Sequence, residues 1–371
     1  MTRCPVCGHE NSGQPLFCGR CTSPIAVVPL HEFEDRDHRR CLAALFELLG
    51  SESIRAMCNP DGAVDPELWR AYLSAFWLRP ETALVLYGEA LAIRARGLEN
   101  AGPWLDLGCG DGIHAALYSG WRFDPTFDAF ASLDLIAADM YNHFDPAEFS
   151  VKVERVGRRI DHGIDIKPTA VARANALGAF NDVRQADATA LPLADKSVGV
   201  IFSNMLRDLG DPLPAALAEC RRVLRDDGKL LISVMTLFYA RNLYFVNAAR
   251  AAENDDDHET AKRLLKLDRG RSVFCQRQLT EKQWQDLLAD SGLRLHATHK
   301  TVGASVIKFW DVGLRPFIHA LLAQRQSWRD SGALPAIKDS LMIGLNYLLA
   351  PLVRSVTDGL ACMELLEIRK R

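Results

Sequence analysis

The chain has neither a long apolar run nor a leader-like start. An uncharged apolar stretch, Leu341 to Val353, covers thirteen residues and contains Pro351, whereas a membrane-spanning helix needs about 20 apolar residues. The first residues, MTRCPVCG, include no apolar segment of the kind found in secretion signals. We therefore expect a cytoplasmic protein without a transmembrane segment. Peripheral membrane contact through the apolar stretch stays open as an alternative to burial.

The chain also lacks an excess of basic residues. It has 44 Lys and Arg against 47 Asp and Glu, which gives a formal net charge of −3. Proteins that grip nucleic-acid phosphates usually carry a basic surplus, so nucleic acid is disfavoured as a partner. With 371 residues and 48% hydrophobic residues, the chain is long enough for one large core with additions.

Cysteine, by contrast, is frequent, and four of the ten cysteines fall within the first 21 residues. Cys4 and Cys7 form one CxxC pair, and Cys18 and Cys21 form a second pair after ten intervening residues. Two such pairs predict a tetrahedral Zn²⁺ site, and four thiolates close its coordination shell, so the zinc is expected to be structural. A redox dithiol and replacement of one cysteine by His9 are the alternatives. We assign residues 1–25 to a zinc ribbon with a docking or folding role.

The following segment, residues 26–100, is predicted to be helical. Apolar residues recur at spacings of three and four over 41–49, 66–76 and 80–94. Pro66 and Pro80 suit the first turn of a helix, because proline lacks the N–H that would be unpaired there. We expect these helices to pack on the main domain.

A glycine-rich turn follows a short apolar strand that ends at Asp106. Gly108, Gly110 and Gly112 alternate after it and allow the backbone to approach a ligand closely. Dinucleotide dehydrogenases use a related G-x-G-x-x-G turn, but Ile113 stands where that pattern needs its third glycine. The spacing therefore disfavours a nicotinamide cofactor.

Strands and helices alternate after this turn, which predicts a Rossmann-like α/β fold with a doubly wound, mostly parallel sheet. Two of the strands end at acids, Asp165 and Asp187. A capping box, Thr280 to Gln283, opens a late helix that precedes a strand. The predicted strands cover 162–166, 182–187, 198–202, 230–234 and 293–296, and the predicted helices cover 168–177, 211–224 and 280–289.

Residues 103–236 resemble the class I S-adenosylmethionine-dependent methyltransferases. The matching segments are Asp106 to Gly112, Gly163 to Asp165, Ala186 to Pro192 and Arg222 to Leu230. The resemblance implies S-adenosyl-L-methionine as the cofactor. It also implies a methionine site at Asp106, Gly108 and Gly110, a ribose site at Asp165 with Ile166, and an adenine site at Asp187 with Ala188.

The sequence departs from that family pattern between the glycine turn and the ribose acid. Asp165 lies 59 residues after Asp106, where about 20 are usual, so we assign an insertion to residues 116–158. Asp134 is a rival ribose acid if the insertion begins later. His143, inside the insertion, is our candidate for a general base.

The predicted organisation is a zinc ribbon (1–25), a helical segment (26–100), a Rossmann-like methyltransferase domain (101–305) and a C-terminal helical cap (306–371). The predicted reaction is methyl transfer to an oxygen or nitrogen atom of a small molecule. An RNA methyltransferase that docks through the ribbon and a non-catalytic cofactor-binding scaffold are the alternatives. The sequence does not determine the oligomeric state.

Overall fold

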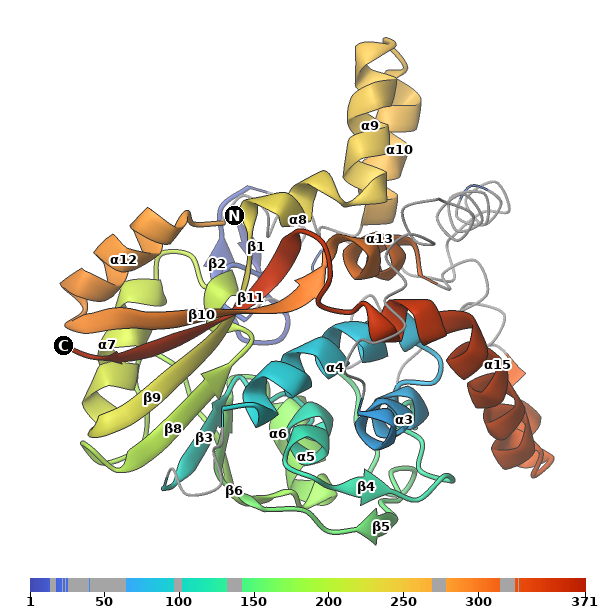
Figure 1. Cartoon of the computed structure of the whole chain (residues 1–371), viewed down its shortest axis with the longest axis horizontal. Helices are drawn as coiled ribbons and strands as arrows, with labels where there is room; N and C mark the ends of the chain where they lie inside the picture. Colours follow the sequence, from blue (N-terminus) through green and yellow to red (C-terminus); the bar gives the residue numbers. More distant parts are fainter. Residues whose placement is uncertain are drawn as a thin grey trace.

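The computed structural model describes residues 1–13, 18–21, 23, 25, 40, 65–96, 102–131, 142–268, 278–313, 324–325 and 327–371. Its centre is a seven-stranded sheet in the order β10-β11-β9-β8-β3-β6-β7 (Figure 1). Only β11 is antiparallel to its neighbours, so it runs against the other six strands. The strands are β3 (Trp104–Leu107), β6 (Ile160–Asp165), β7 (Phe180–Gln185), β8 (Val198–Ser203), β9 (Leu224–Met235), β10 (Leu293–Gly303) and β11 (Ala361–Lys370).

The predicted mostly parallel sheet is confirmed, but the C-terminal helical cap is wrong for the last residues. We assigned 306–371 to helices, whereas β11 lies inside the sheet between β9 and β10. Leu365 packs into the core on one face, and Leu366 and Ile368 pack into the core on the other. A strand that is buried on both faces shows no alternation of polar and apolar residues, and this hid it in the sequence.

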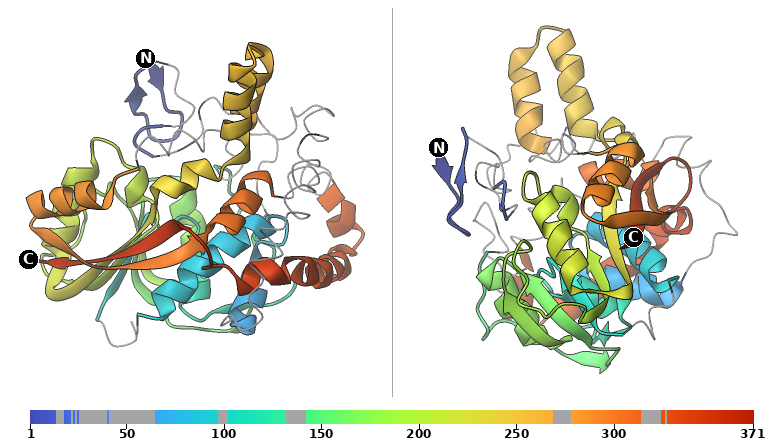
Figure 2. Two further views of the ribbon diagram at one scale, coloured as in Figure 1. Left: turned by 45° about the horizontal axis from the view of Figure 1, so that its top comes forward. Right: turned by 90° about the vertical axis from the view of Figure 1, so that its left-hand side faces the viewer.

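Helices cover both faces of the sheet. Leu230 and Ile232 of β9 point into the core beneath α7 and α12, and Leu231 points into the core on the opposite face. That opposite core includes α3, α4, α5, α6 and α13 (Figure 2). The helices are α3 (Pro66–Ala75), α4 (Pro80–Arg94), α5 (Ile113–Tyr118), α6 (Pro168–Leu177), α7 (Leu213–Val223), α12 (Glu281–Asp290), α13 (Ala304–Val312) and α15 (Leu334–Arg354).

Local signals explain where several helices begin and end. Pro66, Pro80 and Pro168 occupy the first turns of α3, α4 and α6, as predicted. Gly178 ends α6 in the left-handed region at φ 75°. Thr280 and its partner Gln283 form the predicted capping box at the start of α12. The predicted helix over 41–49 lies outside the described residues.

The remaining helices extend beyond the sheet. After the short helix α8 (Leu237–Arg241), α9 (Tyr244–Asn254) and α10 (His258–Asp268) project from the body as a hairpin (Figures 1 and 2). Among the described residues, no single helix has the length and composition of a membrane span. The bent pair Leu334–Asn346 and Leu348–Arg354 meets these criteria only when its two parts are taken together.

The insertion leaves the domain after α5 and returns just before β6. Its predicted start at 116 falls inside α5, so the extra segment begins after Tyr118. The backbone N–H of Arg158 donates to the carbonyl of Ser119 at 3.0 Å, so a hydrogen bond joins the start and the end of the insertion. Within it, β4 (Arg122–Phe123) pairs antiparallel with β5 (Val153–Arg155).

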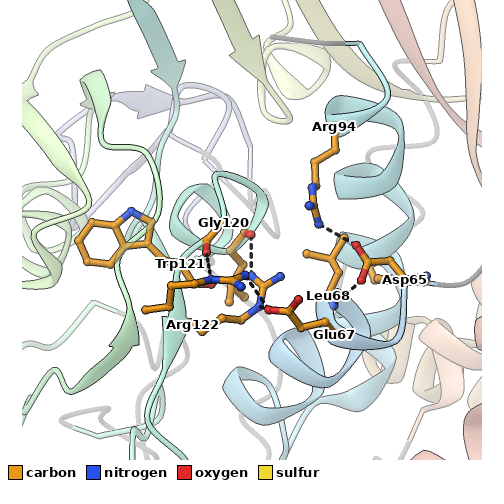
Figure 3. Close-up of polar contacts among 10 residues, drawn as sticks. Asp65, Glu67, Leu68, Arg94, Gly120, Trp121 and Arg122 are labelled. Carbon is orange, nitrogen blue, oxygen red and sulfur yellow. Dashed lines mark hydrogen bonds and ion pairs between the residues drawn. The ribbon is translucent and has the colours of Figure 1, made fainter. Parts of the chain in front are cut away.

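Ion pairs connect the start and the end of the insertion to helix α3 of the helical segment. The carboxylate of Glu67 on α3 accepts from Arg122 Nε at 3.1 Å and contacts Arg155 Nη2 at 2.6 Å (Figure 3). Asp65 caps α3 through Leu68 N and also binds Arg94 of α4 at 2.8 Å. Within the described residues of the helical segment, α3 and α4 therefore pack on the main domain, as the sequence predicted.

We expect Gly157→Ala to destabilise the protein by about 1–3 kcal/mol, because the two ends of the insertion pack too closely to leave space for a methyl group. A Cβ at Gly157 would lie 2.5 Å from three backbone atoms of Ser119, Gly120 and Trp121. Denaturant unfolding measures the difference. Gly344→Ala in α15, where a Cβ would meet no heavy atom within 4 Å, is the control and should not lower stability. Equal stability of the two variants would contradict this close packing.

Candidate cofactor site and metal site

A cavity of about 330 Å³ opens at the carboxyl ends of β3 and β6. From β3 the chain order runs through β6 and β7 on one side and through β8 and β9 on the other, so this edge is a topological switch point. Open parallel sheets bind ligands at such points. The cavity is lined by Arg20, Cys21, Leu107, Gly108, Gly110, Asp111, Ile164, Asp165, Ile166, Lys167, Thr169, Ala170, Arg173, Ala186, Asp187, Ala188, Met205 and Leu209.

The glycine turn forms one wall of this cavity. Gly108, Gly110 and Gly112 have φ values of 77°, 56° and 79°, a region that favours glycine. A Cβ at Gly112 would lie 2.7 Å from the ring of Phe180, whereas one at Gly110 would meet no heavy atom within 4 Å. The turn is therefore packed tightly behind Gly112 and leaves free space at Gly110 for a ligand.

Asp165 lies beside the glycine turn at the end of β6. Its carboxylate accepts from the backbone N–H of Gly110 and of Lys167, each at 2.9 Å. Burial raises the pKa of Asp165 above its ordinary value, although these two backbone hydrogen bonds act against the rise. The carboxylate keeps acceptor capacity for hydroxyl donors in the cavity.

Asp187 lies in the loop after β7, which ends at Gln185, two residues earlier than predicted. One carboxylate oxygen accepts from the N–H and the hydroxyl of Thr189, each at 2.9 Å. The other accepts from Arg20 Nε at 3.0 Å and Arg20 Nη2 at 2.5 Å. Burial tends to raise the pKa of Asp187, but its hydrogen bonds to Thr189 and Arg20 outweigh burial and lower that pKa.

Asp106 does not line the cavity, although the sequence reasoning assigned it to the methionine site. It is buried, and the hydroxyl of Tyr118 donates to its carboxylate at 3.0 Å. Burial raises the pKa of Asp106 to about 7 in spite of this bond. The other predicted cofactor residues line one cavity together: Gly108, Gly110, Asp165, Ile166, Asp187 and Ala188.

Arg173 of α6 is a wall residue that the sequence reasoning missed. It is buried, and its guanidinium donates to the carbonyls of Ala129 and Ala131 in the insertion. It also lies over the ring of Phe149, 4.6 Å from the ring centre, and 3.8 Å from Asp111 of the glycine turn. The insertion is thus anchored directly behind the cavity.

His143 lies in the insertion and is exposed, and it is not among the lining residues. Its neighbour Asn142 accepts a hydrogen bond from Thr169, which does line the cavity, at 3.1 Å. A role for His143 as a base therefore stays a prediction. Asp134, the rival ribose acid, lies outside the described residues.

A cluster of buried polar side chains, which the sequence did not predict, lies against the ends of β8 and β9. The hydroxyl of Ser233 donates to Glu89 of α4, and Arg207 Nη1 donates to Ser233 Oγ at 3.0 Å. His114 Nδ1 contacts the hydroxyl of Tyr72 at 2.9 Å, and its Nε2 lies 3.6 Å from Glu89 Oε2. Burial lowers the pKa of His114 to about 3, so this ring is neutral near pH 7. A lone acid in the apolar run 82–93 was the signal that could have revealed Glu89.

The four N-terminal cysteines come together as predicted. Their ligand atoms all lie within 4.8 Å of one another, with Sγ pairs at 3.6 Å between Cys4 and Cys21 and between Cys7 and Cys18. Zn–S bonds of about 2.3 Å give a tetrahedron with edges of about 3.8 Å, so the donor set fits Zn²⁺. The short strands β1 (Thr2–Arg3) and β2 (Glu10–Asn11) pair beside it.

Comparisons with known proteins agree with these motifs. A family model described as a methyltransferase domain matches residues 147–232. A malonyl-acyl-carrier-protein O-methyltransferase of Methylococcus capsulatus is 55% identical over 47 residues, which are 13% of this chain and 17% of that protein. Another, from a Methylovorus species, is 27% identical over 182 residues, which are 46% of this chain and 60% of that protein. The chain thus spans less than two thirds of the length of these curated relatives.

Solved structures that resemble the chain are distant. A methyltransferase from Aquifex aeolicus is 16% identical, with a TM-score of 0.35, and the match covers 67% of this chain and 92% of that one. A possible histamine N-methyltransferase from Thermotoga maritima is 17% identical, with a TM-score of 0.34, and the match covers 60% of this chain and 75% of that one. At these scores the likeness supports no further statement. Residues 147–232 therefore match a methyltransferase domain, and the motifs and the mostly parallel sheet are those expected of the class I S-adenosylmethionine-dependent methyltransferases.

Proposed function

We propose that this protein transfers a methyl group from S-adenosyl-L-methionine to an oxygen or nitrogen atom of a small molecule. The observation that carries the proposal is the partly buried carboxylate of Asp165, held against the glycine turn at the wall of the cavity. The names of the curated relatives describe O-methylation, which favours oxygen as the accepting atom. The formal net charge of −3 supports a small acceptor over a nucleic acid.

The residues of the cavity fit this cofactor. Asp165, with Ile166 beside it, would accept from the ribose hydroxyls, and the open space at Gly110 would take the methionine part. Asp187 would accept from the adenine amino group, with Ala188 next to the ring. The cofactor supplies an electrophilic methyl group on sulfur, and the protein's part is to orient the acceptor in line with it.

A general base is required only when the acceptor must lose a proton. His143 remains our candidate for this role, because Asn142 beside it is hydrogen-bonded to Thr169 at the cavity wall. His114 is a poor base despite its position in the fold, since burial lowers its pKa to about 3.

The zinc ribbon is proposed to have a structural role. Cys4, Cys18 and Cys21 are buried, and four thiolates leave no open coordination position for a reacting molecule. In so short a segment, the metal takes over the stabilising role of a hydrophobic core.

Asp165→Ala should weaken binding of S-adenosylhomocysteine by about 10- to 100-fold, because hydrogen bonds to a charged acceptor contribute about 1.5–3 kcal/mol each. Isothermal titration calorimetry measures the dissociation constant, and circular dichroism verifies the fold. Asp195→Ala removes an exposed carboxylate from the same domain and should leave the affinity unchanged. Unchanged affinity in Asp165→Ala would transfer the ribose role to Asp134.

His143→Ala should lower kcat by about 10²-fold or more for an acceptor that must be deprotonated, with cofactor affinity unchanged. Product formation from a panel of small hydroxyl, carboxyl and amine compounds, followed by mass spectrometry, identifies an acceptor for the assay. Wild-type turnover by the variant on that acceptor would remove His143 from the mechanism.

The purified protein should contain one zinc ion per chain, and Cys7→Ser should reduce this content. Cys220→Ala is the control, because Cys220 is buried in the core on α7, apart from the cluster. Mass spectrometry with inductively coupled plasma measures the metal. A metal-free wild type that retains its stability would contradict the zinc site.

A further inference from the structure

The cysteine cluster lies directly against the nucleoside end of the cavity. Ile166, the residue after the ribose acid, packs against the buried side chains of Cys4, Cys18 and Cys21. Cys21 and its neighbour Arg20 also line the cavity. Arg20 lies in the turn between Cys18 and Cys21, so metal binding by these two thiolates would fix the position of its backbone.

The carboxylate of Asp187 has no acceptor site left for an adenine amino group. A carboxylate offers about four lone-pair sites. Thr189 donates two hydrogen bonds to Oδ1, and Arg20 donates two to Oδ2. An incoming amino group must therefore displace one of these donors.

Arg20 is the donor that can leave. Thr189 lies two residues from Asp187, and its N–H and hydroxyl shape the loop itself, so their loss would require the loop to refold. The contact with Arg20 spans 167 positions, and its side chain is 42% exposed. A partly exposed ion pair of this kind is weak, and its partners readily exchange it for contacts with water.

We propose that Arg20 competes with the adenine amino group of the cofactor for the carboxylate of Asp187, so that the cofactor must displace Arg20 to bind; we call this contact the latch. This inference rests on the proposed function, because it takes S-adenosylmethionine as the ligand. The latch makes the ribbon a control element of the cofactor site, beyond its structural role. The apparent affinity is reduced by the fraction of molecules in which Arg20 is bound to Asp187.

Removal of the latch should therefore tighten cofactor binding. We expect Arg20→Ala to bind S-adenosylhomocysteine about three- to tenfold more tightly than the wild type, with Arg20→Lys in between because lysine cannot form the paired contact. Calorimetry on the full-length zinc-loaded chain measures the dissociation constants. Zinc content confirms that the ribbon is intact in each variant.

Arg3→Ala is the matched control. It removes the same charge from the same ribbon, and Arg3 is exposed and absent from the cavity wall, so its affinity should equal that of the wild type. Equal or weaker binding by Arg20→Ala would overturn the latch while the wild type still binds. Absence of binding by the wild type and all variants would instead overturn the proposed function.

Discussion

The carboxylate of Asp165 joins the parts of the candidate cofactor site. Its hydrogen bonds to the N–H groups of Gly110 and Lys167 connect the end of β6 to the turn after β3 and to the start of α6. The carbonyl of Ile164 adds bonds from Gly108 N and Cys109 N. Removing a carboxylate from water, even in part, is costly without donors, so the position of Asp165 depends on the geometry of the turn. The cavity exists because this connection fixes two adjacent strand ends.

The insertion and the helical segment stabilise the surroundings of the cavity. Arg173 joins the insertion to α6 through the carbonyls of Ala129 and Ala131, and its stem and guanidinium fill the space beside Phe149. Glu67 on α3 binds Arg122 and Arg155, which lie in the two short strands of the same insertion. Helical segment and insertion therefore act as one structural support, although the sequence presents them as separate additions.

The ribbon has a different relation to the site. Its cysteine cluster packs on Ile166, and Arg20 binds Asp187, so a module with very little core of its own lies against the end of the cavity that these two residues line. The side chain of Arg20 is 42% exposed and forms an ion pair, whereas Asp165 accepts from backbone N–H groups. Hydrogen bonds to the backbone hold the wall of the cavity in place, and a partly exposed ion pair can be replaced by water.

The sequence by itself determined the glycine turn, the acid Asp165 at the end of its strand and the cysteine cluster, because each follows from short spacings that encode local geometry. It also indicated that an insertion separates Asp106 from Asp165. Only the tertiary structure revealed β11, the pairing of Glu89 with Ser233 and the contact between Arg20 and Asp187. The two side-chain contacts join residues 144 and 167 positions apart. Long-range packing alone decides such contacts, and a single sequence carries no periodic signal for them.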